Sequence, residues 1–172
     1  MEEVKILISE EEINKKLDEM AKQIEEDYEG KDVLAVCILK GSVFFAVELT
    51  KRIKSHIGFE FMEVSSYGSS TITSGVVRIT KDIKGSVEGK HVLVIEDILD
   101  TGKTLSYLLD HLKGKKPASI KLCTLLDKPE RRLVDVKVDY TGFEIPDKFV
   151  VGYGLDYNEQ YRNLPYVGCI EE

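Results

Sequence analysis

The fold of this chain is decided by Val92-Leu93-Val94-Ile95-Glu96-Asp97-Ile98-Leu99-Asp100-Thr101-Gly102-Lys103-Thr104. The segment opens as an apolar run without polar alternation, which predicts a strand buried on both faces. Two acidic residues, Glu96 and Asp97, stand where this strand is expected to emerge, and a helical pattern begins near Leu105. Backbone amides in a loop and at a helix N-terminus bind anions, whereas carboxylates bind Mg²⁺ or sugar hydroxyls. The segment therefore predicts a phosphate site beside a metal ion.

Other apolar runs complete a sheet of the same kind. Residues 33–39 form a continuous apolar run, which is typical of a central strand, and residues 44–53 follow it with helical spacing. Residues 118–126 are expected to form a further apolar strand. Ser9 and Glu12 form a capping-box pattern before a helix that ends near Gly30. Further strands are expected over residues 4–8, 58–64, 76–83, 134–143 and 166–170. The alternation of strands with helices predicts an α/β fold with a mainly parallel central sheet.

The composition is that of one ordinary globular domain spanning residues 1–172. The chain has 42% hydrophobic and 32% charged residues, and its formal net charge of −7 argues against a nucleic-acid partner. No run is long enough to span a membrane, and Met1-Glu2-Glu3 does not resemble a signal peptide. Cys37, Cys123 and Cys169 are widely spaced in apolar runs, which is typical of buried free thiols. A cytoplasmic protein without a membrane partner is expected.

Two polar segments each allow two interpretations. Residues 65–75 are rich in hydroxyl side chains and lie between two strands that are expected to form a hairpin. They form either an exposed surface loop or a lid that closes over a site. Lys128, Arg131 and Arg132 follow the strand over residues 118–126 and form either a solvated turn or part of a site. The local sequence does not choose between these interpretations.

The Gly102-Lys103-Thr104 triplet resembles the end of a P-loop, but the rest of that motif is missing. A P-loop requires glycine five residues before Gly102, and this position is Asp97, whose carboxylate would repel a polyphosphate. A response-regulator acidic pocket also pairs carboxylates at strand ends, but it does not need the loop of residues 101–104. Solvation of the strand end is the remaining simple explanation for the two adjacent acids. The third acid, Asp100, favours a ligand site, which in open α/β sheets lies beyond the carboxyl ends of strands.

Residues 92–104 resemble the ribose-phosphate signature of the type I phosphoribosyltransferases: an apolar strand, two acids, two apolar residues, then Asp, Thr, Gly and Thr. Four further segments resemble the hypoxanthine-guanine members of this family: residues 39–41, 64–68, 125–131 and 147–159. The resemblance implies a central, mainly parallel sheet flanked by helices, a flexible hairpin loop, and a small base-binding hood formed by the N- and C-terminal segments. It also implies purine salvage. In that reaction 5-phosphoribosyl pyrophosphate (PRPP) and hypoxanthine or guanine, with xanthine as a third candidate, give a nucleoside monophosphate (IMP or GMP) and pyrophosphate.

The family signature implies a division of labour around the ribose. Asp100 is implied as the proton acceptor at purine N7, a role that requires a carboxylate within hydrogen-bond reach of the base. Residues 101–104 are implied to hold the 5′-phosphate with backbone amides and hydroxyl groups. The full set implied for the ribose and its 5′-phosphate is Glu96, Asp97, Asp100, Thr101, Gly102, Lys103 and Thr104. Many family members have an apolar residue where this chain has Lys103.

The resemblance also implies where pyrophosphate, metal and purine bind. Pyrophosphate is expected at Lys40, Gly41, Ser66, Tyr67 and Arg162, with a non-proline cis peptide at Lys40-Gly41. Mg²⁺ is the implied cofactor, with Glu96, Asp97 and Asp156 as its ligands. The purine is expected at Lys128, Phe149, Val150 and Asp156, with Lys128 donating to O6 and so selecting 6-oxopurines over adenine. Judged without the resemblance, Phe149 is a core residue and Arg162 a surface residue.

Two other functions are compatible with the same fold. One is a non-catalytic regulator that binds PRPP, but such proteins commonly carry an added nucleic-acid-binding domain or a basic face, whereas this chain is a single acidic domain. The other is a phosphoribosyltransferase for a pyrimidine, and Lys128 and Phe149-Val150 argue against it. The resemblance by itself implies a homodimer or a homotetramer.

Overall fold

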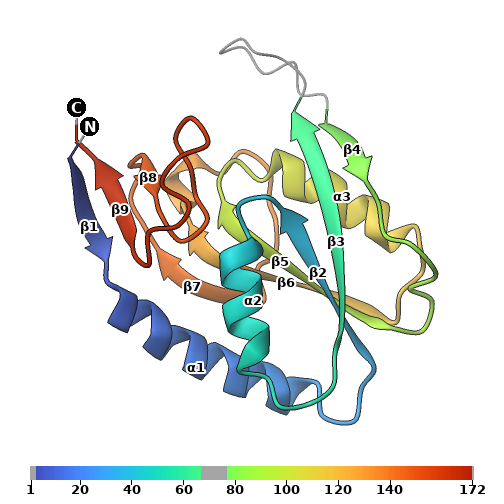
Figure 1. The fold of residues 1–172 in the computed structure, drawn as a ribbon. Helices are drawn as coiled ribbons and strands as arrows, with labels where there is room; N and C mark the ends of the chain where they lie inside the picture. The colour runs from blue at the N-terminus through green and yellow to red at the C-terminus, as the bar shows by residue number, and fades with distance from the viewer. Residues whose placement is uncertain (1–2, 67–76, 172) are drawn as a thin grey trace.

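The computed structural model describes residues 3–66 and 77–171, which contain a six-stranded sheet (Figure 1). In spatial order its strands are β4 (Val77–Lys81), β3 (Gly58–Ser66), β2 (Val33–Leu39), β5 (His91–Leu99), β6 (Ser119–Asp127) and β7 (Tyr140–Glu144). Every neighbouring pair is parallel except β3 and β4, which form an antiparallel pair at one edge. The predictions of a mainly parallel sheet and of a β3–β4 hairpin are confirmed.

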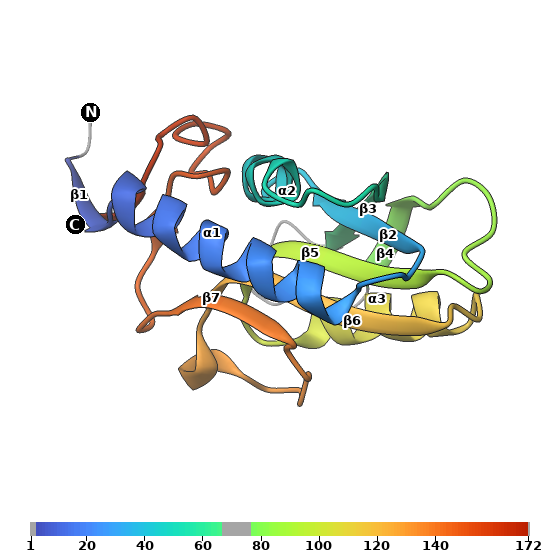
Figure 2. The same ribbon diagram turned by 90° about the horizontal axis from the view of Figure 1, so that it is seen from below.

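Helices cover both faces of this sheet, as Figure 2 shows. Helices α1 (Glu10–Asp27) and α2 (Val43–Lys51) pack on one face, and α3 (Lys103–Lys113) packs on the other. Strand β2 serves both faces, because Ala35 and Cys37 lie in the core cluster of α1 and α2, whereas Val36 and Ile38 lie in that of α3. Burial on both faces explains why the central strands are continuous apolar runs.

The N-terminal helix begins where the capping-box pattern places it. The Ser9 hydroxyl accepts from the Glu12 amide at 3.2 Å, and the Glu12 carboxylate accepts from the Ser9 amide at 2.8 Å. The apolar positions of α1 then face the sheet as fully or nearly fully buried side chains: Ile13, Leu17, Met20, Ala21 and Ile24.

The three cysteines are buried free thiols, as predicted. Within the described ranges, no helix combines the length and the hydrophobicity needed to cross a membrane.

A second, three-stranded sheet joins the two ends of the chain. Its order is β1 (Val4–Ile8), β9 (Val167–Ile170) and β8 (Val150–Val151), and both pairings are antiparallel. Figure 1 shows this small sheet beside the main one, with its N-terminal and C-terminal strands adjacent. The predicted association of the N- and C-terminal segments is therefore present.

The central strand β5 is longer than the sequence predicts. Its parallel ladder with β6 continues past the acidic pair, through Glu96 opposite Thr124 and Leu99 opposite Asp127. Glu96 and Asp97 thus lie inside the strand, and the expectation that the strand ends before them is wrong. Because successive strand side chains point to opposite faces, this extension sends the two carboxylates in different directions.

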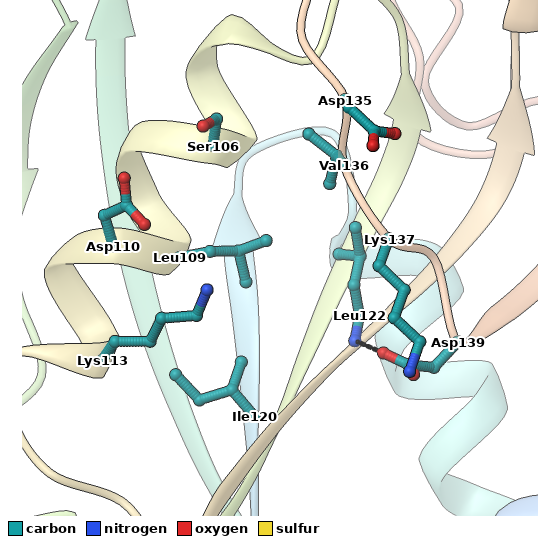
Figure 3. A pocket seen from close by; sticks show the side chains of 10 residues that line it. All are labelled: Ser106, Leu109, Asp110, Lys113, Ile120, Leu122, Asp135, Val136, Lys137 and Asp139. Carbon is teal, nitrogen blue, oxygen red and sulfur yellow. Dashed lines mark hydrogen bonds and ion pairs between the residues drawn. The ribbon is translucent and has the colours of Figure 1, made fainter.

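The predicted strand over residues 134–143 is confirmed only from Tyr140, where β7 begins, and is wrong for residues 134–139. One wall of a pocket of about 280 Å³ beside α3 is formed by Asp135, Val136, Lys137 and Asp139 (Figure 3). Asp139 closes this pocket by bonding both backbone groups of Leu122, since its amide donates to the Leu122 carbonyl and its carboxylate accepts the Leu122 amide, each at 2.9 Å. The apolar alternation arises because Val136 and Val138 pack into the α3 core cluster.

Candidate active site

The segments that follow three parallel strands meet at the carboxyl edge of the sheet. Strand β2 leads into Lys40-Gly41, β5 into the loop of residues 100–104, and β6 into Lys128. The last two are bonded directly, because the Lys128 amide donates to the Leu99 carbonyl at 2.9 Å. Parallel strands bring their carboxyl ends to one edge, which is where α/β folds bind ligands. The sequence-predicted segments are therefore neighbours in space.

The loop after β5 forms a small pocket in front of helix α3. Gly102 caps the helix with a φ of +86°, and a Cβ there would lie 2.6 Å from the Val134 carbonyl oxygen, so the backbone position requires glycine. The Thr101 carbonyl accepts the amides of Leu133 and Val134, at 2.9 and 3.0 Å, which fixes the loop against the chain after β6. The pocket measures about 110 Å³ and is lined by Glu96, Ile98, Leu99, Asp100, Thr101, Gly102, Thr104 and Leu105.

Two residues that the sequence assigns to this pocket lie outside its lining. Lys103 is the first residue of α3 and its side chain is exposed, while its amide donates to the Thr101 hydroxyl at 3.4 Å. Asp97 faces the opposite side of β5, where a Cβ on Gly41 would lie only 1.9 Å from its Oδ2 atom. Glu96 alone of the acidic pair lines the pocket. The two carboxylates therefore lie on opposite sides of β5, with Glu96 toward the pocket and Asp97 toward Gly41.

The environment of the acidic pair raises the pKa of both carboxyl groups. Burial, followed by repulsion from Asp97, raises the pKa of Glu96 well above its usual range. Burial also raises the pKa of Asp97, against the opposing effects of hydrogen bonds and of the Arg162 guanidinium. Two half-buried carboxylates of this kind are a fitting donor set for a divalent cation.

A second charged cluster lies beyond Asp97 and is built from the hood. The Arg162 guanidinium donates to the Gly154 carbonyl at 2.7 Å and pairs with Asp156 at 3.3 Å. Gly154 in turn contacts Gly41, because a Cβ at 154 would lie 2.0 Å from the Gly41 carbonyl oxygen. The structure therefore brings together Gly41, Asp97, Asp156 and Arg162, which are far apart in the sequence.

Glu159, which is not among the site residues predicted from the sequence, also belongs to this cluster. It pairs with Lys40 at 3.2 Å and with Arg162 at 3.3 Å, so one carboxylate joins the loop after β2 to the hood. The available signal was that Glu159 is the last residue of the 147–159 segment, which resembles the hypoxanthine-guanine members of the family. The cis peptide bond is at Leu39–Lys40, one bond earlier than expected.

The residues expected around the purine differ in how far they are exposed. Phe149 has 55% of its surface exposed, so it is not a core residue, and its ring meets Tyr157 edge-on at 5.6 Å between centroids. Val150 is buried in β8. Lys128 is only 8% exposed, and its Nζ atom lies 3.9 Å from the Asp147 carboxylate. The Lys128 ammonium group therefore lies beside Asp147, two residues before the exposed Phe149 ring.

The basic turn after β6 contacts the proposed proton acceptor. Arg131, in the 3₁₀ turn η1 (Pro129–Arg131), donates from Nε to Asp100 Oδ1 at 2.6 Å. Arg132 donates to the Asp100 carbonyl at 3.1 Å and pairs with the largely buried Asp127 carboxylate. Of the two interpretations of this cluster, a purely solvated turn is therefore wrong.

Some of the predicted site residues lie at the edge of the described residues or outside them. Ser66 ends β3, but its side chain is not described, and Tyr67 lies outside the described residues, as does most of the segment of residues 65–75. In residues 3–66 and 77–171 no three histidine, cysteine, aspartate or glutamate side chains form a ready-made metal cluster. Mg²⁺ commonly takes one or two carboxylates and completes its shell with substrate oxygens and water, so the acidic pair and Asp156 fit this ion as separate partial sites.

Comparisons with known proteins identify the family of this chain. The family model of the phosphoribosyl transferase domain matches residues 4–158, and the chain belongs to this family. It is 53% identical over 168 residues to the hypoxanthine-guanine phosphoribosyltransferase of Streptococcus thermophilus, covering 98% of this chain and 93% of the relative. The resemblance found in the sequence is confirmed.

Solved structures give the same result for the fold. A hypoxanthine phosphoribosyltransferase from Staphylococcus aureus superposes with a TM-score of 0.93 at 49% identity, covering 97% of this chain and 91% of that one. A hypoxanthine-guanine phosphoribosyltransferase from Bacillus anthracis, solved with a HEPES molecule in its active site, gives a TM-score of 0.93 at 49% identity, covering 98% and 100% of the two chains. The predicted type I phosphoribosyltransferase fold is thereby confirmed.

Gly41→Ala is expected to damage the site more than the fold. The added methyl group would meet the end of the flexible Asp97 side chain, so the carboxylate shifts while the backbone stays. We expect kcat/KM for PRPP to fall about tenfold, because small misplacements in a site are costly, while the melting temperature changes little. Steady-state kinetics and thermal melts measure the two effects. Gly114→Ala, at a helical φ of −62°, is the control and should retain full kcat/KM. An unaltered kcat/KM in Gly41→Ala would contradict the role of this contact.

Proposed function

We propose that the chain transfers the 5-phosphoribosyl group from PRPP to hypoxanthine or guanine, giving IMP or GMP and pyrophosphate in a Mg²⁺-dependent reaction of purine salvage in the cytoplasm. One observation carries this proposal: the phosphate-type loop, the Asp100 carboxylate and the nearly buried Lys128 share one edge of the sheet. The names of the relatives, which cover nearly the whole chain, support the choice of base.

The first step of the proposed mechanism is to fix the ribose. The 5′-phosphate lies in the pocket before α3, where loop amides, the threonine hydroxyls and the helix N-terminus attract an anion. Glu96, which lines the same pocket, accepts from the ribose hydroxyls. Fixing the phosphate and the hydroxyls at once places the anomeric carbon, and such positioning is a large part of catalysis.

The leaving pyrophosphate lies on the other side of β5. Arg162 offers a planar fork of donors, and Lys40 and the Lys40-Gly41 backbone complete its surroundings. Asp97 and Asp156 would hold Mg²⁺ here, with Glu96 beside Asp97, and the ion would neutralise charge on the departing group. Both Lys40 and Arg162 pair with Glu159 in the free protein, so pyrophosphate replaces a carboxylate that these cations already bind.

The purine completes the site between Phe149 and Lys128. Phe149 presents an exposed face for stacking, and Lys128 donates to O6. A 6-amino group is itself a donor, so adenine would leave the buried ammonium without an acceptor, which is costly. Asp100 accepts the proton from N7 as the new bond forms at N9, which keeps the charge balanced.

The proposal includes a homodimer or a homotetramer. Phe44 and Val47 on α2 are 41% and 40% exposed and directly follow the Lys40-Gly41 loop. Exposed apolar side chains on one helix support an interface between copies at this position.

The test is to incubate the purified protein with PRPP and Mg²⁺ and, separately, hypoxanthine, guanine, xanthine, adenine and uracil. We expect conversion of hypoxanthine and guanine, measured by chromatography of the nucleotide product and by released pyrophosphate. Chelation of the metal should abolish turnover, and added Mg²⁺ should restore it. Failure to convert either 6-oxopurine would overturn the proposal. Binding of PRPP without any turnover would instead support a regulator.

A further inference from the structure

We propose that Arg131 is a positioning residue for Asp100, and that Asp147 couples Arg131 to Lys128. This proposal rests on the function proposed above. It concerns two residues, Arg131 and Asp147, to which neither the sequence pattern nor the family resemblance assigned a role in the reaction. In this proposal Lys128, which donates to O6, and Asp100, which accepts the N7 proton, belong to one network of ion pairs.

The observation is a chain of four alternating charges. Lys128 Nζ lies 3.9 Å from Asp147 Oδ1, and the same oxygen lies 3.5 Å from an Arg131 Nη1 atom. Arg131 then donates from Nε to Asp100 Oδ1 at 2.6 Å. Asp147 is the one carboxylate in the described part of the chain within ion-pair distance of Lys128. Lys128 and Arg131 thus share the Asp147 carboxylate as an ion-pair partner.

The backbone holds the two cations of this chain at a fixed separation. Lys128 and Arg131 belong to one short turn, in which the Arg131 amide donates to the Lys128 carbonyl at 3.2 Å. The turn is bonded to the end of β5, because the Lys128 amide donates to the Leu99 carbonyl at 2.9 Å. Asp100 directly follows Leu99, the last residue of β5, and the turn with both cations directly follows β6. The proton acceptor and the two cations are therefore held by the adjacent carboxyl ends of these two strands.

The hydrogen bond selects one orientation of the Asp100 carboxylate. A carboxylate that is free to rotate presents either oxygen in many directions. With Oδ1 held by the Arg131 Nε–H, the plane of the group is set and Oδ2 is left to accept from the purine. Arg132 does not serve this purpose, since it bonds the Asp100 carbonyl rather than the carboxylate. The Arg131 and Asp100 side chains are 45% and 43% exposed, so we expect an effect on orientation more than on stability.

The negative charge of Asp147 offsets the repulsion between the Lys128 and Arg131 side chains. The Lys128 ammonium is nearly buried, and a buried charge without a partner is strongly unfavourable. The shared carboxylate neutralises Lys128 on one side and Arg131 on the other. Removing its charge should therefore disturb both purine binding, through Lys128, and turnover, through Arg131 and Asp100.

The experiment compares Arg131→Gln, Arg131→Lys, Asp147→Asn and the double variant Arg131→Gln/Asp147→Asn, with Glu130→Gln as the control from the same turn. We expect Arg131→Gln to lower kcat for hypoxanthine about tenfold while the Kd for PRPP, measured by calorimetry, stays unchanged. Arg131→Lys should recover part of kcat, because it restores the charge without the planar donor. Asp147→Asn should lower kcat and raise KM for hypoxanthine. In the double variant the kcat effects should not multiply, because the two residues act through one carboxylate, Asp100.

The outcomes separate this proposal from the proposed function. Wild-type turnover of a 6-oxopurine with unaltered kcat in Arg131→Gln would overturn the positioning role and leave the function standing. Independent, multiplying kcat effects of Arg131→Gln and Asp147→Asn would overturn the coupling through Asp147. If kcat fell equally in Arg131→Gln and in the control Glu130→Gln, the effect would come from a disturbed turn rather than from the Arg131 side chain. This result would also overturn the proposal. Absence of wild-type turnover would remove the proposed function and this inference together.

Discussion

Asp100→Asn is expected to lower turnover of hypoxanthine by about 10²–10⁴-fold, because the amide oxygen cannot take up the N7 proton. The substitution preserves shape, and the asparagine oxygen still accepts the Arg131 Nε–H that the carboxylate accepts at 2.6 Å. Asp100 also lines the phosphate pocket without being the only polar group there, so PRPP should still bind. Rapid-mixing kinetics measures the chemical step and calorimetry measures PRPP affinity.

The matched control for this substitution is Asp110→Asn. Asp110 is an exposed residue on α3 that lines the separate pocket of Figure 3, and none of the proposed site residues lines that pocket. It should retain wild-type turnover. If Asp100→Asn also retained wild-type turnover, Asp100 would not be the proton acceptor. If it lost turnover only because PRPP no longer bound, the residue would belong to the phosphate site alone.

Lys128→Met is expected to lower kcat/KM for hypoxanthine by about 10²–10³-fold, since the loss of one buried, charged hydrogen-bond partner commonly costs this much. Methionine keeps most of the packing of the lysine stem, which is only 8% exposed, so the fold should survive. Adenine cannot accept from the ammonium group in the wild type, so its kcat/KM should change far less. The ratio of the two values should therefore collapse, and steady-state kinetics with both bases measures it.

Lys148→Met serves as the control for the lost charge. Lys148 is exposed and directly follows Asp147, so it changes the same local charge without entering the proposed purine site. It should leave the ratio of hypoxanthine to adenine unaltered. A Lys128→Met variant that kept its preference for hypoxanthine would contradict the O6 contact, and selection would then lie with the hood backbone.

Local sequence pattern predicts the class of fold and most of the segments that meet at the candidate site. Continuous apolar runs identify central strands because those strands are buried on both faces, and the Ser9–Glu12 capping box places the start of α1. The signature of residues 92–104 predicts a tight loop before α3, where Gly102 caps the helix with a φ of +86°. These features depend on residues close together in the chain, and local pattern therefore predicts them.

The positions of the charged groups relative to one another depend on the tertiary structure. The register of β5 on β6 carries the strand through Glu96 and Asp97, and the alternation of strand side chains then separates them onto two sides. In the same way, Arg131 reaches Asp100 and Glu159 reaches Lys40 only because strand ends and hood meet at one edge. Such pairs join residues 31 and 119 positions apart, and no local periodicity encodes them, because their distances depend on strand order and register rather than on sequence spacing.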